Sequence, residues 1–277
     1  MITLKLKHWR TIGVAATTLG LAACGGETGA DVGEGGEGEA GEPPPIGENG
    51  GATPAVAGNG GEAGEASAGE RGGEHGEAGA LLAYTGLTGD QLTAMRIQHL
   101  RGFVMAAAQI VADRGGNSGS PADAAILVQQ GLLEVYDPAP DQFGVLDVTP
   151  LREAAAGTNF TRAQMMQRLR AAQENLTRAI GQLNFDDAQL VVRMIDLSTG
   201  LYQHVLTDGT ADPTEYQHSM GAALAAQQAL LLREDDLRRE NLGAYSRAVG
   251  ELNRYVALFP TREPPATPAT YQQVLVQ

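Results

Sequence analysis

The tripeptide Tyr-Gln-His occurs twice within a short stretch of this chain, at 202–204 and at 216–218. Imidazole nitrogens and carboxylate oxygens such as those of Glu215 can bind Fe or Cu ions. Two histidine-bearing arms around a turn could therefore hold a metal ion, or the repeat could belong to an ordinary helical hairpin. A further histidine, His99, interrupts an apolar stripe upstream. The candidate metal ligands of the chain are His99, His204, Glu215 and His218.

Helical phase favours the hairpin over a shared metal site. At about 100° per residue, His204 lies at the rim of its helix's apolar stripe, whereas His218 lies on a face of small residues that comprises Gly221, Ala222, Ala225 and Ala229. Metal ligands must approach one centre to about 2 Å, which these directions do not favour. The small face instead predicts close approach of another helix. Tyr202 and Tyr216 fall on or beside the apolar stripes, so we expect them in the core.

His99 lies among the apolar residues of the first expected helix, which are Leu92, Met95, Phe103 and Ala106. A buried imidazole needs hydrogen-bond partners for its ring nitrogens. The position favours a core histidine bonded to a carboxylate or a carbonyl, and a role as a metal ligand is the alternative.

The only cysteine, Cys24, follows a basic start and the uncharged run 11–23, the order typical of an export signal. That run is too short to span a bilayer, for which about 20 residues are needed. The junction Leu21-Ala22-Ala23-Cys24-Gly25 resembles the lipobox of bacterial lipoproteins. The resemblance implies cleavage before Cys24 and attachment of acyl chains such as palmitate to it. Gly25 implies sorting, in a Gram-negative cell, to the outer membrane facing the periplasm.

The alternative to the lipobox is a secreted protein with a chance cysteine at the cleavage site. If Cys24 is acylated, no thiol remains for a disulfide, a thiolate metal site or a cysteine nucleophile.

We divide the chain into a signal peptide (1–23), the lipidated cysteine with a linker (24–80) and a helical domain (81–277). Of the 37 glycines, 20 lie in residues 25–80, where twelve acidic residues face the single basic residue Arg71. Such a segment buries too little apolar surface to fold, so we expect a disordered spacer. Loose binding of cations by its carboxylates is the alternative. The net charge of −14 and the lack of clustered Lys and Arg argue against nucleic acid as a partner.

Residues 81–277 predict an all-α fold, an antiparallel bundle of about six helices around one core. Caps and turns predict a first helix from Thr88 to Arg114, stopped by Gly115, a second from Ser120-Pro121 to before Asp137, and a short helix from Thr149-Pro150 to Gly157. Two longer helices follow, from Thr161 to Leu183 and from Asp186 to Asp208-Gly209. The next helix starts at Asp212-Pro213 and breaks near Glu234 to Asp236, and the last one ends at Pro260.

The segment 195–229, with Tyr202, Asp208-Gly209 and Asp212-Pro213-Thr214-Glu215-Tyr216-Gln217, resembles the extracytoplasmic helical segments of imelysin-like proteins and of domains associated with bacterial iron permeases. The resemblance implies a periplasmic helical bundle and a link to metal-ion uptake. The Gly-x-His-x-x-Glu motif of imelysin-like proteins has no counterpart around His99, where Gln98, Leu100, Arg101 and Gly102 stand.

The leading hypothesis is a non-enzymatic accessory or binding lipoprotein that is anchored to a membrane of the cell envelope. It is linked to the uptake of iron or other metal ions, and its first partner is the lipid bilayer, through Cys24. The second is a structural or partner-docking lipoprotein without a small ligand, in which the Ala/Gly face near His218 receives another envelope protein. No cofactor is implied beyond an Fe or Cu ion. An enzyme is the third hypothesis, and the paired acids Asp186-Asp187 and Asp235-Asp236 fit helix caps better than a catalytic dyad.

Overall fold

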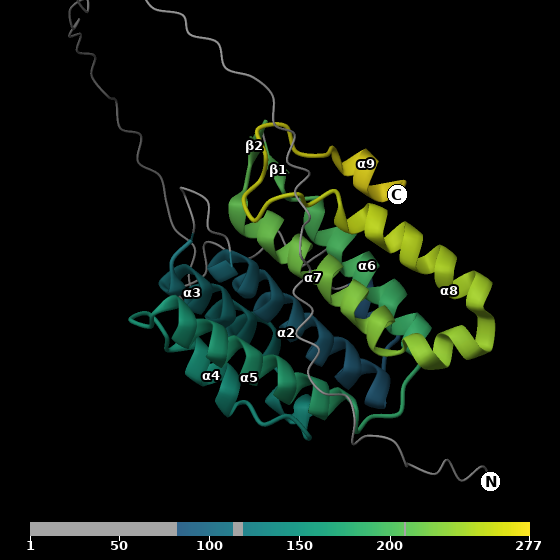
Figure 1. The fold of residues 1–277 in the computed structure, drawn as a ribbon, viewed down its shortest axis with the longest axis horizontal. Coiled ribbons are helices and arrows are strands. Elements are labelled where there is room, and N and C mark those ends of the chain that lie inside the picture. Colours follow the sequence, from purple (N-terminus) through teal and green to yellow (C-terminus); the bar gives the residue numbers. More distant parts are fainter. Residues whose placement is uncertain (1–81, 113–118, 208) are drawn as a thin grey trace, which may run out of the picture. The chain divides into compact units, whose positions relative to one another are not determined.

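A computed structural model of the chain describes residues 82–112, 119–207 and 209–277. These residues form the all-α fold that the sequence predicts, with one two-stranded hairpin (Figure 1). The predicted signal peptide, Cys24, the linker and the helix stop at Gly115 lie outside the described residues. Within the described part, no helix has both the length and the apolar character to cross a membrane.

The main helices are α2 (Gly89–Ala112), α3 (Pro121–Gly131), α5 (Arg162–Ile180), α6 (Asp187–Tyr202), α7 (Pro213–Leu232) and α8 (Glu234–Val256). The shorter elements are the π-helix η1 (Leu132–Tyr136), the 3-10 helix η2 (Pro140–Phe143), α4 (Thr149–Ala155), β1 (Leu206–Thr207), β2 (Thr210–Ala211) and α9 (Tyr271–Leu275).

Four of the predicted helix starts are confirmed by their capping hydrogen bonds. Ser120 and Thr161 each form a reciprocal capping box with the residue three positions later. The Asp186 carboxylate accepts from the backbone N–H of Gln189 at 2.9 Å. The Asp212 carboxylate accepts from the N–H of Thr214 at 2.7 Å and of Glu215 at 3.2 Å, ahead of Pro213 in the first turn of α7. These caps satisfy backbone donors that a helix start leaves open.

The predicted end of α6 at Asp208-Gly209 is wrong. The helix ends at Tyr202, and β1 and β2 then pair antiparallel with Leu206 opposite Ala211 and Thr207 opposite Thr210. Gly209 has a φ of +80°, which a glycine adopts without strain and which allows the tight hairpin turn. The strands are too short for an alternating pattern to show in the sequence.

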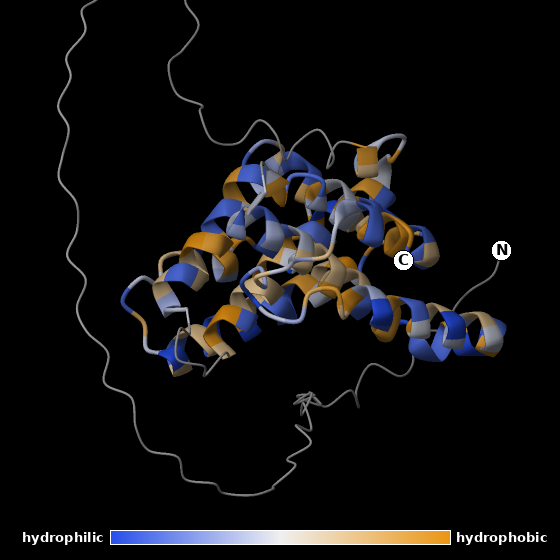
Figure 2. Ribbon diagram, turned by 90° about the horizontal axis from the view of Figure 1, so that it is seen from above, coloured by the Kyte–Doolittle hydropathy of each residue, from blue (hydrophilic) through white to orange (hydrophobic). Residues whose placement is uncertain are grey.

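Helix α2 contacts α3 and α5 on one side and α6 and α7 on the other, so it joins the two halves of the domain (Figure 1). Hydrophobic and hydrophilic residues alternate along the helices (Figure 2), and the hydrophobic side chains that face neighbouring helices form one core cluster. The core is therefore shared by the helices before and after the α5–α6 connection.

The predicted close approach of a helix to the small face of α7 is confirmed, and the approaching helix is α2. A Cβ built on Gly221 would lie 2.6 Å from the carbonyl oxygen of Gly102. Ala222 and Ala225, on the same face, are 1% and 0% exposed. The expectation that this face receives another protein is therefore wrong, because α2 of the same chain covers it.

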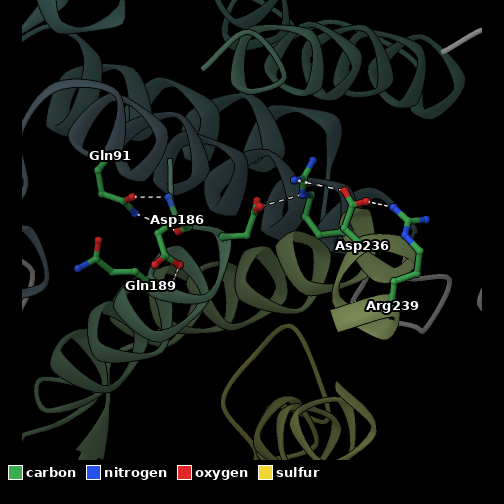
Figure 3. Close-up of polar contacts among 7 residues, drawn as sticks. Gln91, Asp186, Gln189, Asp236 and Arg239 are labelled. Carbon is green, nitrogen blue, oxygen red and sulfur yellow. Dashed lines mark hydrogen bonds and ion pairs between the residues drawn. The ribbon is translucent and has the colours of Figure 1, made fainter. Parts of the chain in front are cut away.

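Polar contacts fix the corner where α6 begins and α7 meets α8 (Figure 3). Gln91 on α2 exchanges two hydrogen bonds with the backbone of Asp186, at 2.8 and 3.3 Å. Arg233 pairs with Asp187 at 2.8 Å and with Asp236 at 3.3 Å, and Asp236 also pairs with Arg239. Asp186 thus caps α6, as the sequence predicts. The predicted cap by Asp235-Asp236 is wrong, because α8 begins without a side-chain cap and Asp236 forms ion pairs instead.

Candidate functional site

The four predicted metal ligands lie in different surroundings. His99 is on α2 and His218 on α7, and both are mostly buried, with 7% and 8% of their surfaces exposed. The Phe103 ring contacts both imidazoles, with centroid distances of 5.3 Å to His99 and 4.8 Å to His218. His204 lies in the turn after α6, and Glu215 lies in the first turn of α7.

His99 has a different partner from the one expected. Its Nδ1 lies 2.8 Å from the hydroxyl of Tyr84, whereas the sequence predicts a carboxylate or a carbonyl. Tyr84 precedes α2, so its approach depends on the path of the chain before that helix. Burial, followed by the charges of His218 and Arg96, lowers the pKa of His99 to about 3. The imidazole is therefore neutral at physiological pH, as a core histidine should be.

His218 is also a neutral core residue. Burial lowers its pKa to about 4, against the opposing charge of Asp212. Its Nε2 has no hydrogen-bond partner among the protein atoms. The helical phase correctly places His218 on the small face of α7, but its contact with Phe103 depends on which helix covers that face.

The predicted ligands do not fit a shared metal centre. Among the described residues, no group of three or more His, Cys, Asp or Glu side chains gathers to hold a metal ion. Glu215 Oε2 is buried without a hydrogen-bond partner, and burial followed by the charge of Asp212 raises the pKa of its carboxyl. Phe103 occupies the space next to both core histidines, so an ion there would first have to displace an aromatic ring.

Tyr202 and Tyr216 are core residues, as predicted. They are 1% and 0% exposed, and both rings pack against Phe259, with centroid distances of 5.7 and 5.5 Å. The Tyr202 hydroxyl donates to the carbonyl oxygen of Ala269 at 2.7 Å. This bond ties the segment after α8 to α6, so the repeated Tyr-Gln-His contributes to packing through its tyrosines.

A surface groove of about 570 Å³ lies between α6, α8, α9 and the chain before α2. It is lined by Leu82, Thr85, Arg193, Ile195, Asp196, Thr199, Gly200, Gln203, Tyr255, Tyr271, Val274, Leu275 and Gln277. Its volume is within the range of sites that bind ligands of moderate size. The sequence does not predict the groove, because no short-range pattern indicates that α9 packs against α6.

Hydroxyl groups at the groove connect to a buried network between α6, α7 and α8. The Tyr255 hydroxyl lies 3.0 Å from the hydroxyls of both Thr199 and Ser198. Ser198 and Ser219 then exchange hydrogen bonds with each other's carbonyl oxygens, at 2.8 and 2.7 Å. This network holds Tyr255 in place, so one wall of the groove is preorganised.

The lining of the groove combines apolar surface with neutral polar groups. Its charged side chains, Arg193 and Asp196, lie 3.7 Å apart and largely neutralise each other. Apolar walls with hydroxyl and amide groups between them can hold a ligand by burial and neutral hydrogen bonds.

Comparison of the chain with protein-family models, with curated proteins and with solved structures gave no match. The resemblance to lipoproteins and to imelysin-like domains therefore stays a prediction from the residues quoted above.

Proposed function

We propose that this chain is a non-enzymatic accessory lipoprotein of the bacterial cell envelope, anchored through Cys24, whose helical domain docks a segment of another envelope protein. The groove between α6, α8 and α9 carries the proposal. It replaces the Ala/Gly face of α7, which α2 covers, as the docking surface.

The composition of the groove favours an extended peptide as the occupant. Leu82 and Leu275 on its lining are 70% and 52% exposed, so they offer apolar surface that a partner can bury. Gln203 adds a side-chain amide that can donate to and accept from a peptide backbone. Because Arg193 is already paired with Asp196, the groove does not require a strongly charged partner.

The lipid anchor and the linker give this docking surface its setting. An acylated Cys24 would hold the chain at a membrane, since two or more acyl chains give stable anchoring. A Gly-rich linker of this length would have a reach of about 40 to 45 Å, so the groove could meet partners away from the bilayer surface. Outer-membrane attachment facing the periplasm is the location we propose.

Metal-ion uptake enters this proposal only as the process that the imelysin resemblance suggests. The predicted ligands do not converge, so we expect calorimetric titration of the purified protein with Fe or Cu ions to show no binding tighter than about millimolar. Tighter binding would restore direct metal binding to the function.

The docking proposal is tested by crosslinking in cells. A photoreactive residue at Gln203, which lines the groove, should give one dominant crosslinked partner. The same group at Arg170, which is exposed on α5 and away from the groove lining, is the control. Diffuse products at both positions, or the same product at both, would argue against docking in the groove.

A further inference from the structure

Arg101 is a charged side chain in the interior of the domain. It lies on α2 with 1% of its surface exposed, and its Nη2 donates to the Thr177 hydroxyl on α5 at 3.0 Å. Its Nε and Nη1 have no hydrogen-bond partner in the protein, and no ion pair joins it to the described residues. Burial alone lowers the pKa of Arg101, to about 10, so the guanidinium stays charged at neutral pH.

An isolated charge in a protein interior is costly, and buried charges are therefore normally paired or bound to a counter-ion. The Thr177 hydroxyl offsets little of this cost, because it is neutral and also donates to the Gln173 carbonyl at 2.9 Å. The Gln98 Oε1 is likewise buried without a partner, one helical turn from Arg101. A water molecule could satisfy these hydrogen-bonding groups, but it would leave the positive charge without a counter-charge.

We propose that Arg101 anchors a buried site for a small monovalent anion of the halide class between α2 and α5. The Nε and Nη1 groups, which remain after Nη2 has bonded Thr177, supply the N–H donors. The anion is monovalent because one cation must be offset, and it is small because the side chain is almost fully enclosed. The site is separate from the groove and from the proposed docking function.

The proposal predicts that chloride stabilises the purified protein. The melting temperature is measured while chloride replaces gluconate at constant ionic strength, which keeps the screening of surface charges unchanged. Chloride at about one hundred times its dissociation constant should raise the melting temperature by roughly 5 to 10 °C relative to the chloride-free protein. Arg101→Met should lose this response, whereas Arg170→Met, which removes an exposed arginine of α5, should keep it.

A second readout uses the unaltered protein and does not depend on a variant that folds. Crystals soaked in bromide should show an anomalous peak beside the Arg101 guanidinium. Formate, tested in the same way as chloride, reports whether a carboxylate can replace the halide. The proposal is overturned if the unaltered protein shows neither an anomalous peak nor a chloride response, which is the result expected for a water molecule. A chloride response retained in Arg101→Met, with no bromide at the guanidinium, would also overturn it.

Discussion

Substituting Gly221 by alanine should push α2 and α7 apart and destabilise the domain, because the two helices cross here with their backbones in contact. The new Cβ would lie 2.6 Å from the Gly102 oxygen, 2.9 Å from the Gly102 carbonyl carbon and 3.4 Å from the Ala106 Cβ. The two closest atoms belong to the backbone of a neighbouring helix, so no side chain can rotate away. The helices must move apart, and the packing along their shared face must loosen.

The expected loss follows from two opposing contributions. Overpacking in a core typically costs about 1–3 kcal/mol. Replacing glycine by alanine in a helix contributes up to about 1 kcal/mol in the other direction. Since the clash involves backbone on α2, we expect overpacking to dominate and the free energy of unfolding of Gly221→Ala to fall by about 2 kcal/mol. Urea unfolding of the purified protein, followed by circular dichroism, measures this change.

Two further alanine substitutions make the prediction specific. A Cβ on Gly102 would meet the Gly221 carbonyl group at 3.0 Å, a milder clash, so Gly102→Ala should lose less stability than Gly221→Ala. A Cβ on Gly250, within α8, would meet nothing within 4 Å, so Gly250→Ala should gain up to about 1 kcal/mol. Equal effects of Gly221→Ala and Gly250→Ala would refute the backbone-contact argument.

Three other predictions concern titration, helix capping and anchoring. Because the folded pKa values of His99 (about 3) and His218 (about 4) lie below the ordinary value of 6.5, the unfolded chain binds more protons between these values, and stability should fall as the pH drops below 6.5. The free energy of unfolding, measured with urea, should fall by roughly 2 kcal/mol for each histidine by pH 5. This pH dependence should weaken in His99→Gln, and an unchanged dependence would contradict a neutral, buried His99. Asp212→Ala should lose about 1 kcal/mol through its missing cap on α7, measured by the same unfolding assay, whereas no loss would show that Pro213 alone fixes the start. Cys24→Ser should move the protein from the membrane to the soluble fraction of cells, and retention in the membrane fraction would argue against a lipid anchor.

Four helix starts could be predicted because each depends on residues that are close in sequence. Ser120, Thr161, Asp186 and Asp212 satisfy donors within their own first turns. The end of α6 could not be predicted in this way. Val205 lies beyond the helix yet is buried in the core at 0% exposure, four residues after the buried Leu201. The helical spacing of apolar residues therefore gives no sign of where the helix stops.

The candidate sites depend on contacts between distant segments, and this explains why the sequence predicts them only in part. Helical phase places His99 and His218 on buried faces, but pairing His218 with His204 assumes that neighbours in sequence are the relevant neighbours in space. The contact with Phe103 arises because α2 crosses α7. The groove likewise requires α9 to return to α6, and Arg101 shows its lack of a counter-charge only once α5 is in place.

The most direct test of the docking proposal compares two adjacent residues of the C-terminal segment. Leu275 lines the groove, whereas its neighbour Val276, which is 78% exposed, does not. With the photoreactive residue at Gln203, the yield of the dominant crosslinked product should fall strongly in Leu275→Glu and stay unchanged in Val276→Glu. Equal yields in the two variants would contradict docking in the groove between α6, α8 and α9.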